Sequence, residues 1–347
     1  EFSGADWALH VAQTAQQAGV LENVKGVDLN APATRELVAE LLFRAIADAS
    51  TVTYTPAFGY VTDKVIGAAS GTIGSKNFDL KSKDDADEWG RPGTLWSYNT
   101  GDKETLVLDK ADVTYTVATS ECDIAHDLGL SKDLDCSVFV NGILLNSTYK
   151  IERLDTKTKI GAQGRLMEVY KDAKTIVMID TFLAKVDSVK DATYDAQGHL
   201  KKDATITLLV YDRTATSKNS TEYTTLTLTN GDENYTYEEG DMVLVNAYTK
   251  TNTVTGAGKV LTTTDKTDSK QYAEILGKAE SVEGTQTVIW KNAAQHTVNG
   301  TTYDDAAEFN HNEADQDSTA TYSWYFDQYN NLIGVVESAS NYLVIEA

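Results

Sequence analysis

The chain has 347 residues, and its 52 acidic against 30 basic side chains give a formal net charge of -22 at pH 7. Such a surface repels phosphate backbones and anionic lipid, which argues against nucleic acid and membranes as partners. No apolar run is long enough to cross a bilayer, and a hydrophobic content of 41% excludes a disordered acidic tail. The length predicts about two to four domains.

The first predicted elements are two amphipathic helices that precede residue 50. Their apolar residues recur at intervals of three and four, which is the period of a helix that buries one face. These residues are Trp7, Val11, Ala12, Ala15 and Ala18 in the first helix, and Leu37, Val38, Leu41, Leu42, Ala45 and Ile46 in the second. Thr34 is placed to cap the second helix, with Arg35 and Glu36 in its first turn. We therefore expect each helix to bury its apolar face.

This pair of helices resembles one S-layer homology repeat. The resemblance rests on a Trp-Ala opening at Trp7, an Ala-Gly-Val-Leu turn at residues 18–21, and Thr34-Arg35-Glu36 ahead of a Val-Ala-Glu-Leu-Leu-Phe helix. In that family three repeats together bind pyruvylated secondary cell-wall polysaccharide. The resemblance therefore implies a wall-binding site at Trp7, Thr34, Arg35 and Glu36, with Arg35 binding a ketal carboxylate and Trp7 stacking on a sugar. The alternative is that Trp7 is a core residue and Arg35 a solvated residue at a helix start.

From residue 51 onward the chain changes to short alternating runs separated by Gly, Asn and Asp, which is typical of hairpins in sandwiches and barrels. Strands are predicted over residues 205–211, 223–229 and 242–248, and a short helix over 123–129 ends at a glycine. Hairpins with an Asp-containing turn are predicted over residues 168–179, 194–200 and 325–336. The expected fold is mainly β, with a small N-terminal helical repeat and a body of β-sandwich or β-barrel modules.

Changes in composition predict four segments. They are a helical repeat at residues 1–50, a β-rich module with the short helix at 51–185, a β-barrel or sandwich module at 186–265, and a C-terminal β module at 266–347. Residues 87–98, 127–130 and 161–170 are similar to the β region that follows the last S-layer homology repeat in surface proteins of gut clostridia. That similarity implies a cell-surface context and no known chemistry.

Cys122 and Cys136 are the only two cysteines. They enclose a loop for which the entropy model gives about 3 kcal/mol of stabilisation if they are bonded. We expect a disulfide, in keeping with an extracellular protein, although two buried thiols would leave the same pattern in the sequence. A catalytic pair of Cys122 and His126 is a further alternative, disfavoured because no third group is placed to orient the histidine.

The remaining titratable residues do not predict a catalytic or metal site. The five histidines have no ligand spacing, so no zinc site is expected. The acidic stretches at residues 84–88 and 313–317 would suit calcium, but they lack the ordered spacing of a calcium loop, and a solvated acidic loop is the alternative. The chain has no nucleophile elbow, Walker loop or dinucleotide fingerprint, so we expect neither an enzyme nor a cofactor other than calcium.

The resemblance and the β-rich body together imply a secreted bacterial cell-surface protein of S-layer type. It would be held at the wall through S-layer homology repeats and would present its β modules outward. Its partners would be secondary cell-wall polysaccharide or neighbouring surface proteins. The main alternative is a surface adhesin that binds host glycan or host protein through exposed Tyr and Trp, and a surface hydrolase is the third.

Overall fold

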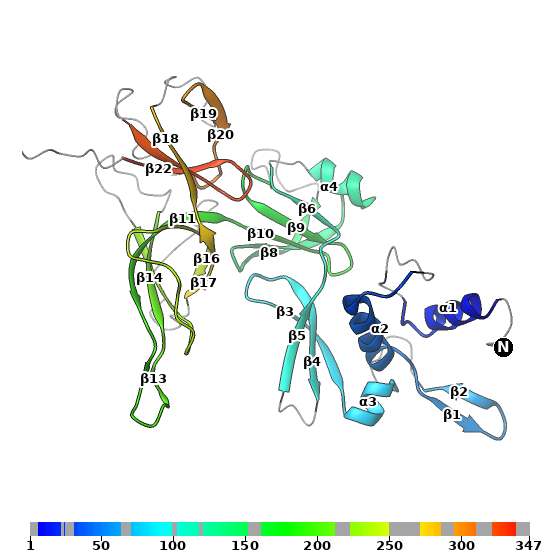
Figure 1. Cartoon of the computed structure of the whole chain (residues 1–347). Helices are drawn as coiled ribbons and strands as arrows, with labels where there is room; N and C mark the ends of the chain where they lie inside the picture. The colour runs from blue at the N-terminus through cyan, green and yellow to red at the C-terminus, as the bar shows by residue number, and fades with distance from the viewer. Residues whose placement is uncertain are drawn as a thin grey trace, which may run out of the picture. The chain divides into compact units, whose positions relative to one another are not determined.

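The structure is a computed structural model that describes residues 6–21, 24, 31–63, 71–98, 103–117, 121–151, 161–211, 223–249, 271–285, 295–309 and 321–337. Strands predominate among these residues and form several separate sheets, with a few short helices (Figure 1). The mainly β fold expected from the sequence is therefore confirmed. The chain divides into two compact units, which are unit 1 (residues 1–87 and 92–109) and unit 2 (residues 88–91 and 110–347).

Unit 1 combines helices with two small sheets. Its described helices are α1 (Trp7–Gln17), α2 (Arg35–Ala47) and α3 (Ile73–Phe78). Its strands are β1 (Val52–Thr55), β2 (Gly59–Thr62), β3 (Lys81–Ala86), β4 (Pro92–Tyr98) and β5 (Lys103–Leu108). β1 and β2 form an antiparallel hairpin, and β3, β4 and β5 form an antiparallel sheet in that order. The sequence predicted α1 and α2 but not α3, which is short and begins at a capping box between Thr72 and Ser75.

Two contacts position α2 within unit 1. The ring of Phe43 meets the ring of Trp96 on β4 edge to face, with the ring centroids 5.2 Å apart. On another side α2 approaches α3 so closely that a Cβ atom at Gly74 would overlap Leu80 and the backbone of Ile46. Glycine is therefore required at this crossing because any side chain would push the two helices apart.

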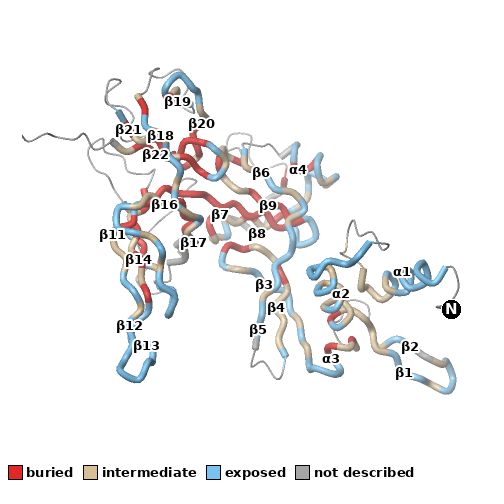
Figure 2. Tube along the Cα trace, viewed as in Figure 1, coloured by how far each residue is buried: buried red, intermediate tan, exposed pale blue. Residues whose placement is uncertain are grey.

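Unit 1 nevertheless has little core, and its described backbone contains few buried residues (Figure 2). Ala47 is the one buried residue of α2, and α1 buries none. Trp7, which begins α1, keeps 54% of its surface exposed. The expectation that each helix buries its apolar face is therefore wrong for α1, because the described part of unit 1 does not cover that face.

Unit 2 begins with a five-stranded sheet that is covered on both faces. Its elements are β6 (Val113–Tyr115), α4 (Glu121–Leu128), β7 (Asp135–Val140), β8 (Ile143–Lys150), β9 (Leu166–Tyr170) and β10 (Thr175–Ile179), with strand order β6-β9-β10-β7-β8. β10 is buried along its whole length. Ile176 faces a core shared with Ile124 of α4, and Val177 faces a second core that contains Trp89. The short helix and the β9–β10 hairpin agree with the sequence prediction.

The second sheet of unit 2 is a half-barrel. Its strands are β11 (Thr181–Lys190), β14 (Thr205–Tyr211), β15 (Tyr223–Thr229), β16 (Met242–Thr249) and β17 (Gln271–Lys278), all antiparallel in the order β15-β14-β11-β16-β17. A separate hairpin of β12 (Thr193–Tyr194) and β13 (Leu200–Lys202) lies between β11 and β14 in the chain. Side chains alternate between the two faces of this sheet, and its main core lies on one of them. Leu208 and Leu226 are fully buried on that face, while Thr207 and Thr227 meet on the other. The strands predicted at 205–211, 223–229 and 242–248 are confirmed.

The third part of unit 2 is built around Trp324. It contains a sheet of β18 (Glu280–Gly284), β21 (Tyr322–Phe326) and β22 (Leu332–Glu337), and a hairpin of β19 (Gln295–Val298) and β20 (Thr301–Asp304). The Trp324 indole N–H donates to the carbonyl of Gly284 at 3.1 Å, so this ring is fully buried with its polar atom bonded. The hairpin predicted over residues 325–336 is confirmed.

Strands pass almost without a break from one sheet of unit 2 to the next. Asp180 alone separates β10 from β11, and Ala279 alone separates β17 from β18. The boundary predicted between residues 185 and 186 falls inside β11, so the change of sheet lies at Asp180 instead. Lys185 and Asp187, at the predicted boundary, are exposed positions of this strand, and Val186 between them is buried. The boundary predicted at residue 265 lies outside the described residues.

Candidate functional site

The N-terminal turn of α2 has the local structure that its sequence predicts. Thr34 is extended, and its hydroxyl oxygen accepts a hydrogen bond from the Leu37 N–H at 3.1 Å, so it caps the helix. Glu36 lies in the first turn, where a negative charge favours the positive end of the helix dipole. Arg35 is exposed and forms no ion pair with the described residues, so its guanidinium is available to an anion.

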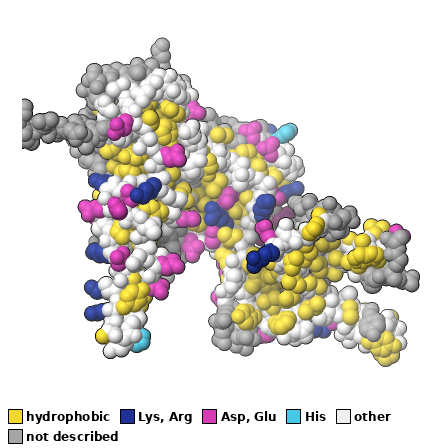
Figure 3. All heavy atoms as spheres, viewed as in Figure 1, with side chains coloured by type: hydrophobic (Ala, Val, Ile, Leu, Met, Phe, Trp, Pro, Cys, Tyr) yellow, Lys and Arg dark blue, Asp and Glu magenta, His cyan; other side chains and the backbone are white. Residues whose placement is uncertain are grey.

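Arg35 stands at one end of an exposed apolar stripe on α2. Val38, Leu42 and Ile46 follow it at helical spacing, and they remain 43%, 59% and 38% exposed. We call these four residues the α2 stripe. Apolar side chains gather on the face of unit 1 that carries α2 (Figure 3). A large exposed apolar surface in a folded unit marks a contact with another molecule or segment.

Trp7 lies on the other described helix of this unit. Trp7, Leu9 and Val11 each keep more than a third of their surface exposed. Trp7 is therefore not a core residue in this structure. No hydrogen bond or ring contact joins Trp7 to Thr34, Arg35 or Glu36 within the described part of the chain. The proposed wall-binding residues are therefore placed as exposed groups on two helices, and only those of the α2 turn are adjacent.

The β1–β2 hairpin adds exposed aromatic surface that the sequence analysis missed. Tyr54 is 62% exposed, and Phe58 at the turn is 83% exposed. Asp63 anchors the base of the hairpin by accepting hydrogen bonds from Lys76 at 2.6 Å, Thr51 at 2.7 Å and Thr53 at 2.8 Å. These bonds, with Lys76 first, lower the pKa of Asp63 to about 2. The alternation of Thr with Val and Tyr before Pro56 could have predicted strand β1 of this hairpin.

The structure gives Cys136 no disulfide partner among the described residues, and the bridge to Cys122 stays a prediction. Cys136 is a free, buried thiol on β7, packed against Ile124 and Ala125 of α4. Burial raises the pKa of this thiol, as expected for a cysteine that acts as a small hydrophobic residue. The side chain of Cys122 lies outside the described residues. His126 is solvent-exposed and its Nδ1 lies 3.2 Å from Asp127 on the same helix, so the described contacts do not turn it toward the core.

The acidic stretch at residues 84–88 lies on and just after the exposed strand β3. Asp85 pairs with Lys83 at 3.5 Å, and its Oδ1 accepts from the Ala86 N–H. No group of three or more His, Cys, Asp or Glu residues within the described ranges is arranged to hold a metal ion. The stretch at residues 313–317 lies outside the described residues, so calcium there stays a prediction.

A buried polar cluster joins the sheets of unit 2, and we call it the junction. The two carboxylate oxygens of Asp180 accept hydrogen bonds from the Arg165 guanidinium at 2.5 and 2.9 Å. Asn141 Nδ2 also donates to this carboxylate, at 2.8 Å. Burial alone would lower the pKa of Arg165, but the Asp180 charge outweighs it and the pKa is raised. The side chain of Asp180 is fully buried, so this pair is structural and beyond the reach of a substrate.

The same junction reaches the third sheet through the turn between β21 and β22. Gln163 donates to Asn331 at 2.7 Å, and Gln328 donates to the hydroxyl of Thr181, the first residue of β11, at 2.9 Å. Asp327 holds this turn by accepting from the backbone N–H groups of Tyr329 and Asn331. Burial raises the pKa of Asp327. Three sheets are therefore tied together by hydrogen bonds between side chains.

Among the residues that the structure describes, a buried pair of His296 and Asp305 is the arrangement that most invites a catalytic interpretation. His296 Nδ1 lies 2.7 Å from Asp305 Oδ1, and the imidazole packs near the rings of Phe309 and Trp324. Both side chains are only 4% exposed. A substrate cannot approach a pair that is enclosed in this way, so the pair is better explained as a structural link between β19 and the segment after β20.

Comparison of the sequence and structure with protein-family models, curated proteins and solved structures found no match. None of the described helices is long and apolar enough to span a membrane.

Proposed function

We propose that this protein is a structural component of the bacterial cell surface, in which unit 1 makes the attachment and unit 2 is a rigid β body. The partners of unit 1 would be secondary cell-wall polysaccharide or neighbouring surface proteins. The observation that carries this proposal is the α2 stripe, where exposed Val38, Leu42 and Ile46 extend from Arg35, which forms no ion pair with any described residue. An apolar surface that ends in a guanidinium suits a polymer of sugar rings that carries carboxylates.

The contrast between the two units supports this division of roles. Most of the large apolar side chains that the structure describes as exposed belong to unit 1, whereas nearly all of the buried ones belong to unit 2. Unit 2 has continuous strands and a fully bonded junction, which resist bending between sheets. A body of this kind needs no catalytic group, and we propose that it performs no hydrolysis.

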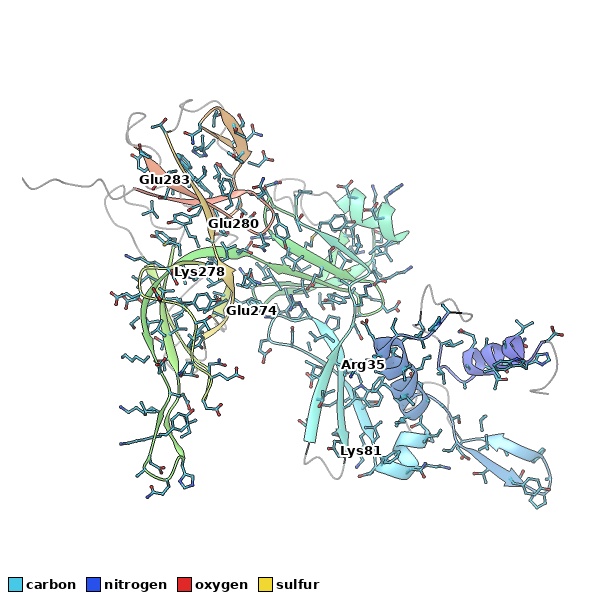
Figure 4. All side chains as sticks on the ribbon, in the orientation of Figure 1. Arg35, Lys81, Glu274, Lys278, Glu280 and Glu283 are labelled. Carbon is cyan, nitrogen blue, oxygen red and sulfur yellow. The ribbon has the colours of Figure 1, made fainter. Side chains whose placement is uncertain are left out.

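Sedimentation of the full chain with purified cell walls tests the attachment. We expect saturable binding that Arg35→Ala weakens at least tenfold, because the exposed cation is lost while the Thr34 cap remains. Lys81→Ala is the matched control, since Lys81 is an exposed cation elsewhere in unit 1 (Figure 4). Equal binding by the wild type and Arg35→Ala would exclude Arg35 from the site. Walls stripped of their secondary polysaccharide distinguish a polysaccharide partner from a protein partner.

The adhesin alternative is favoured by a different surface. Among the aromatic residues of unit 2 whose burial the structure describes, Tyr194 is exposed, and the others are buried, as Tyr170 and Trp324 are, or half-buried, so they offer little to a host ligand. Tyr54 and Phe58 on the β1–β2 hairpin are the better candidates, because both rings are open to solvent. Binding to host glycan or secreted host protein that is lost in Phe58→Ser and retained in Arg35→Ala would favour the adhesin.

A further inference from the structure

Strand β5 is an open edge of the three-stranded sheet in unit 1. It pairs with β4 on one side, and the described residues provide no strand on its other side. The Asp109 N–H donates to the Pro92 carbonyl, which shows which residues of this segment direct their N–H groups toward β4. Because antiparallel pairs alternate, Thr105 and Val107 direct their N–H groups to β4, while those of Leu106 and Leu108 point to the open edge.

The open edge of β5 lacks the features that protect other edges from association. The opposite edge, β3, carries Lys81, Lys83, Asp84 and Asp85, which are charged groups that oppose pairing. The central part of β5 is the uncharged run Thr105-Leu106-Val107-Leu108, with Val107 and Leu108 still 43% and 42% exposed. β5 contains neither proline nor a bulge. An extended, apolar and unpaired edge is a template for another strand.

We propose that a second copy of this chain pairs its own β5 with this edge, in antiparallel orientation about a two-fold axis at Val107. This register places Leu106 opposite Leu108 of the second copy and uses the outward N–H and C=O groups of both strands. It sets Val107 against Val107 across the axis. Pairing through β5 does not require wall binding, because it would take place between two copies of the chain in solution.

The charges that flank β5 favour a second copy as the occupant. In the same register exposed Glu104 stands opposite Lys110 of the second copy, and the two-fold axis repeats that pair. Thr105 stands opposite Asp109, where a hydroxyl faces a carboxylate. The segment 104–110 is therefore complementary to itself in this register, with an apolar centre and Glu104 opposite Lys110 on either side of it. A weak, salt-sensitive dimer follows, since only one short strand from each copy is paired.

Sedimentation velocity of the full chain over a micromolar concentration range tests the proposal. Glu104→Lys or Lys110→Glu alone would set like charges opposite each other twice and raise the dissociation constant about tenfold. The double variant Glu104→Lys/Lys110→Glu exchanges the charges and would restore dimerisation. Lys81→Glu on β3 is the matched control and would leave the dissociation constant unchanged. Restoration in the double variant also excludes misfolding as the cause of the single effects.

Hydrogen exchange provides a second, residue-specific readout. The amides of Leu106 and Leu108 would gain protection as the concentration rises, while those of Thr105 and Val107, bonded to β4, would be protected at every concentration. A chain that stays monomeric throughout overturns the proposal. A dimer that leaves Leu106 and Leu108 unprotected, or that the double variant fails to restore, also overturns it. If the amides of Leu106 and Leu108 become protected only when an extended peptide is added, the edge binds a different partner, and self-association is overturned.

Discussion

Arg165 and Asp180 form a buried ion pair at the residue where the first sheet of unit 2 passes into the second. Nε and one Nη of Arg165 donate to the carboxylate of Asp180. The side-chain amide of Asn141 donates to the same carboxylate, and its oxygen accepts from the backbone N–H of Asp180. Because both carboxylate oxygens of Asp180 are bonded, the pair fixes the direction in which β10 continues as β11. Removal of one partner would leave the other charge buried and uncompensated.

We therefore expect Asp180→Ala to lower the free energy of unfolding of unit 2 by about 3 kcal/mol or more. Asp180→Asn keeps an acceptor beside Arg165 and Asn141 and should lose less. Asp187→Ala is the matched control, because Asp187 is an exposed residue of the same strand. Denaturant unfolding of each variant measures the difference. A loss in Asp180→Ala no larger than in Asp187→Ala would contradict a structural role for the pair.

Acid should weaken the attachment of the β1–β2 hairpin to unit 1. The bonds from Lys76, Thr51 and Thr53 hold the pKa of Asp63 at about 2, below its ordinary value of 3.8. A carboxyl with a lowered pKa in the folded state contributes stability that is present above its unfolded pKa and is lost as the pH falls through the folded one. The stability of unit 1 should therefore fall between about pH 4 and pH 2.

Thermal unfolding followed across that pH range measures this dependence. Asp63→Asn cannot titrate, so its stability should be lower than wild type near neutral pH and change less between pH 4 and pH 2. Asp84→Asn is a suitable control, because Asp84 is an exposed carboxyl on strand β3 of the same unit. A decline as steep in Asp63→Asn as in the wild type would assign the acid sensitivity to other carboxyl groups.

Local patterns predicted the elements of this protein better than its long-range contacts. The Thr34 cap, the strand at 205–211 and the turn at Asp327 depend on neighbours within a few residues, so a single sequence reveals them. The boundary predicted at residue 185 falls inside β11, where Lys185 and Asp187 face solvent on either side of buried Val186, as alternate residues of a strand do.

The junction and the surface of unit 1 could not be read from one sequence. Arg165 meets Asp180, and Gln163 meets Asn331, only because separate sheets come together. An apolar helix position predicts burial, but it does not say whether the covering partner belongs to the same unit. Leu42 has the pattern of a core residue and is 59% exposed.

Cys136 should behave as a free but protected thiol. Its side chain is buried between β7 and α4, and burial raises its pKa, so little thiolate is present at neutral pH. We expect slow alkylation of the folded chain without reductant and rapid alkylation of Cys136 in denaturant, followed by mass spectrometry of its peptide. Ser137→Cys on the same strand serves as a control for a less buried position. A Cys136 that stays unlabelled in denaturant until reductant is added would restore the predicted bridge to Cys122.

The adjacent residues Leu42 and Phe43 should separate binding from folding on α2. Leu42 is mostly exposed, so Leu42→Lys should change the free energy of unfolding by no more than about 0.5 kcal/mol, since lysine has a similar helix propensity. Phe43 packs edge to face on Trp96, so Phe43→Ala should cost about 2 kcal/mol.

Wall binding should show the opposite order. If the α2 stripe is the attachment surface, Leu42→Lys places a charge in its apolar centre and weakens sedimentation with cell walls, while the helix remains folded. Phe43→Ala leaves the exposed side chains of the stripe in place, so at a temperature where it stays folded it should bind nearly as the wild type does. Denaturant unfolding and wall sedimentation on the same preparations test both halves. A Leu42→Lys variant that is as unstable as Phe43→Ala would mean that the stripe is covered within the protein, because only a buried leucine would resist that charge.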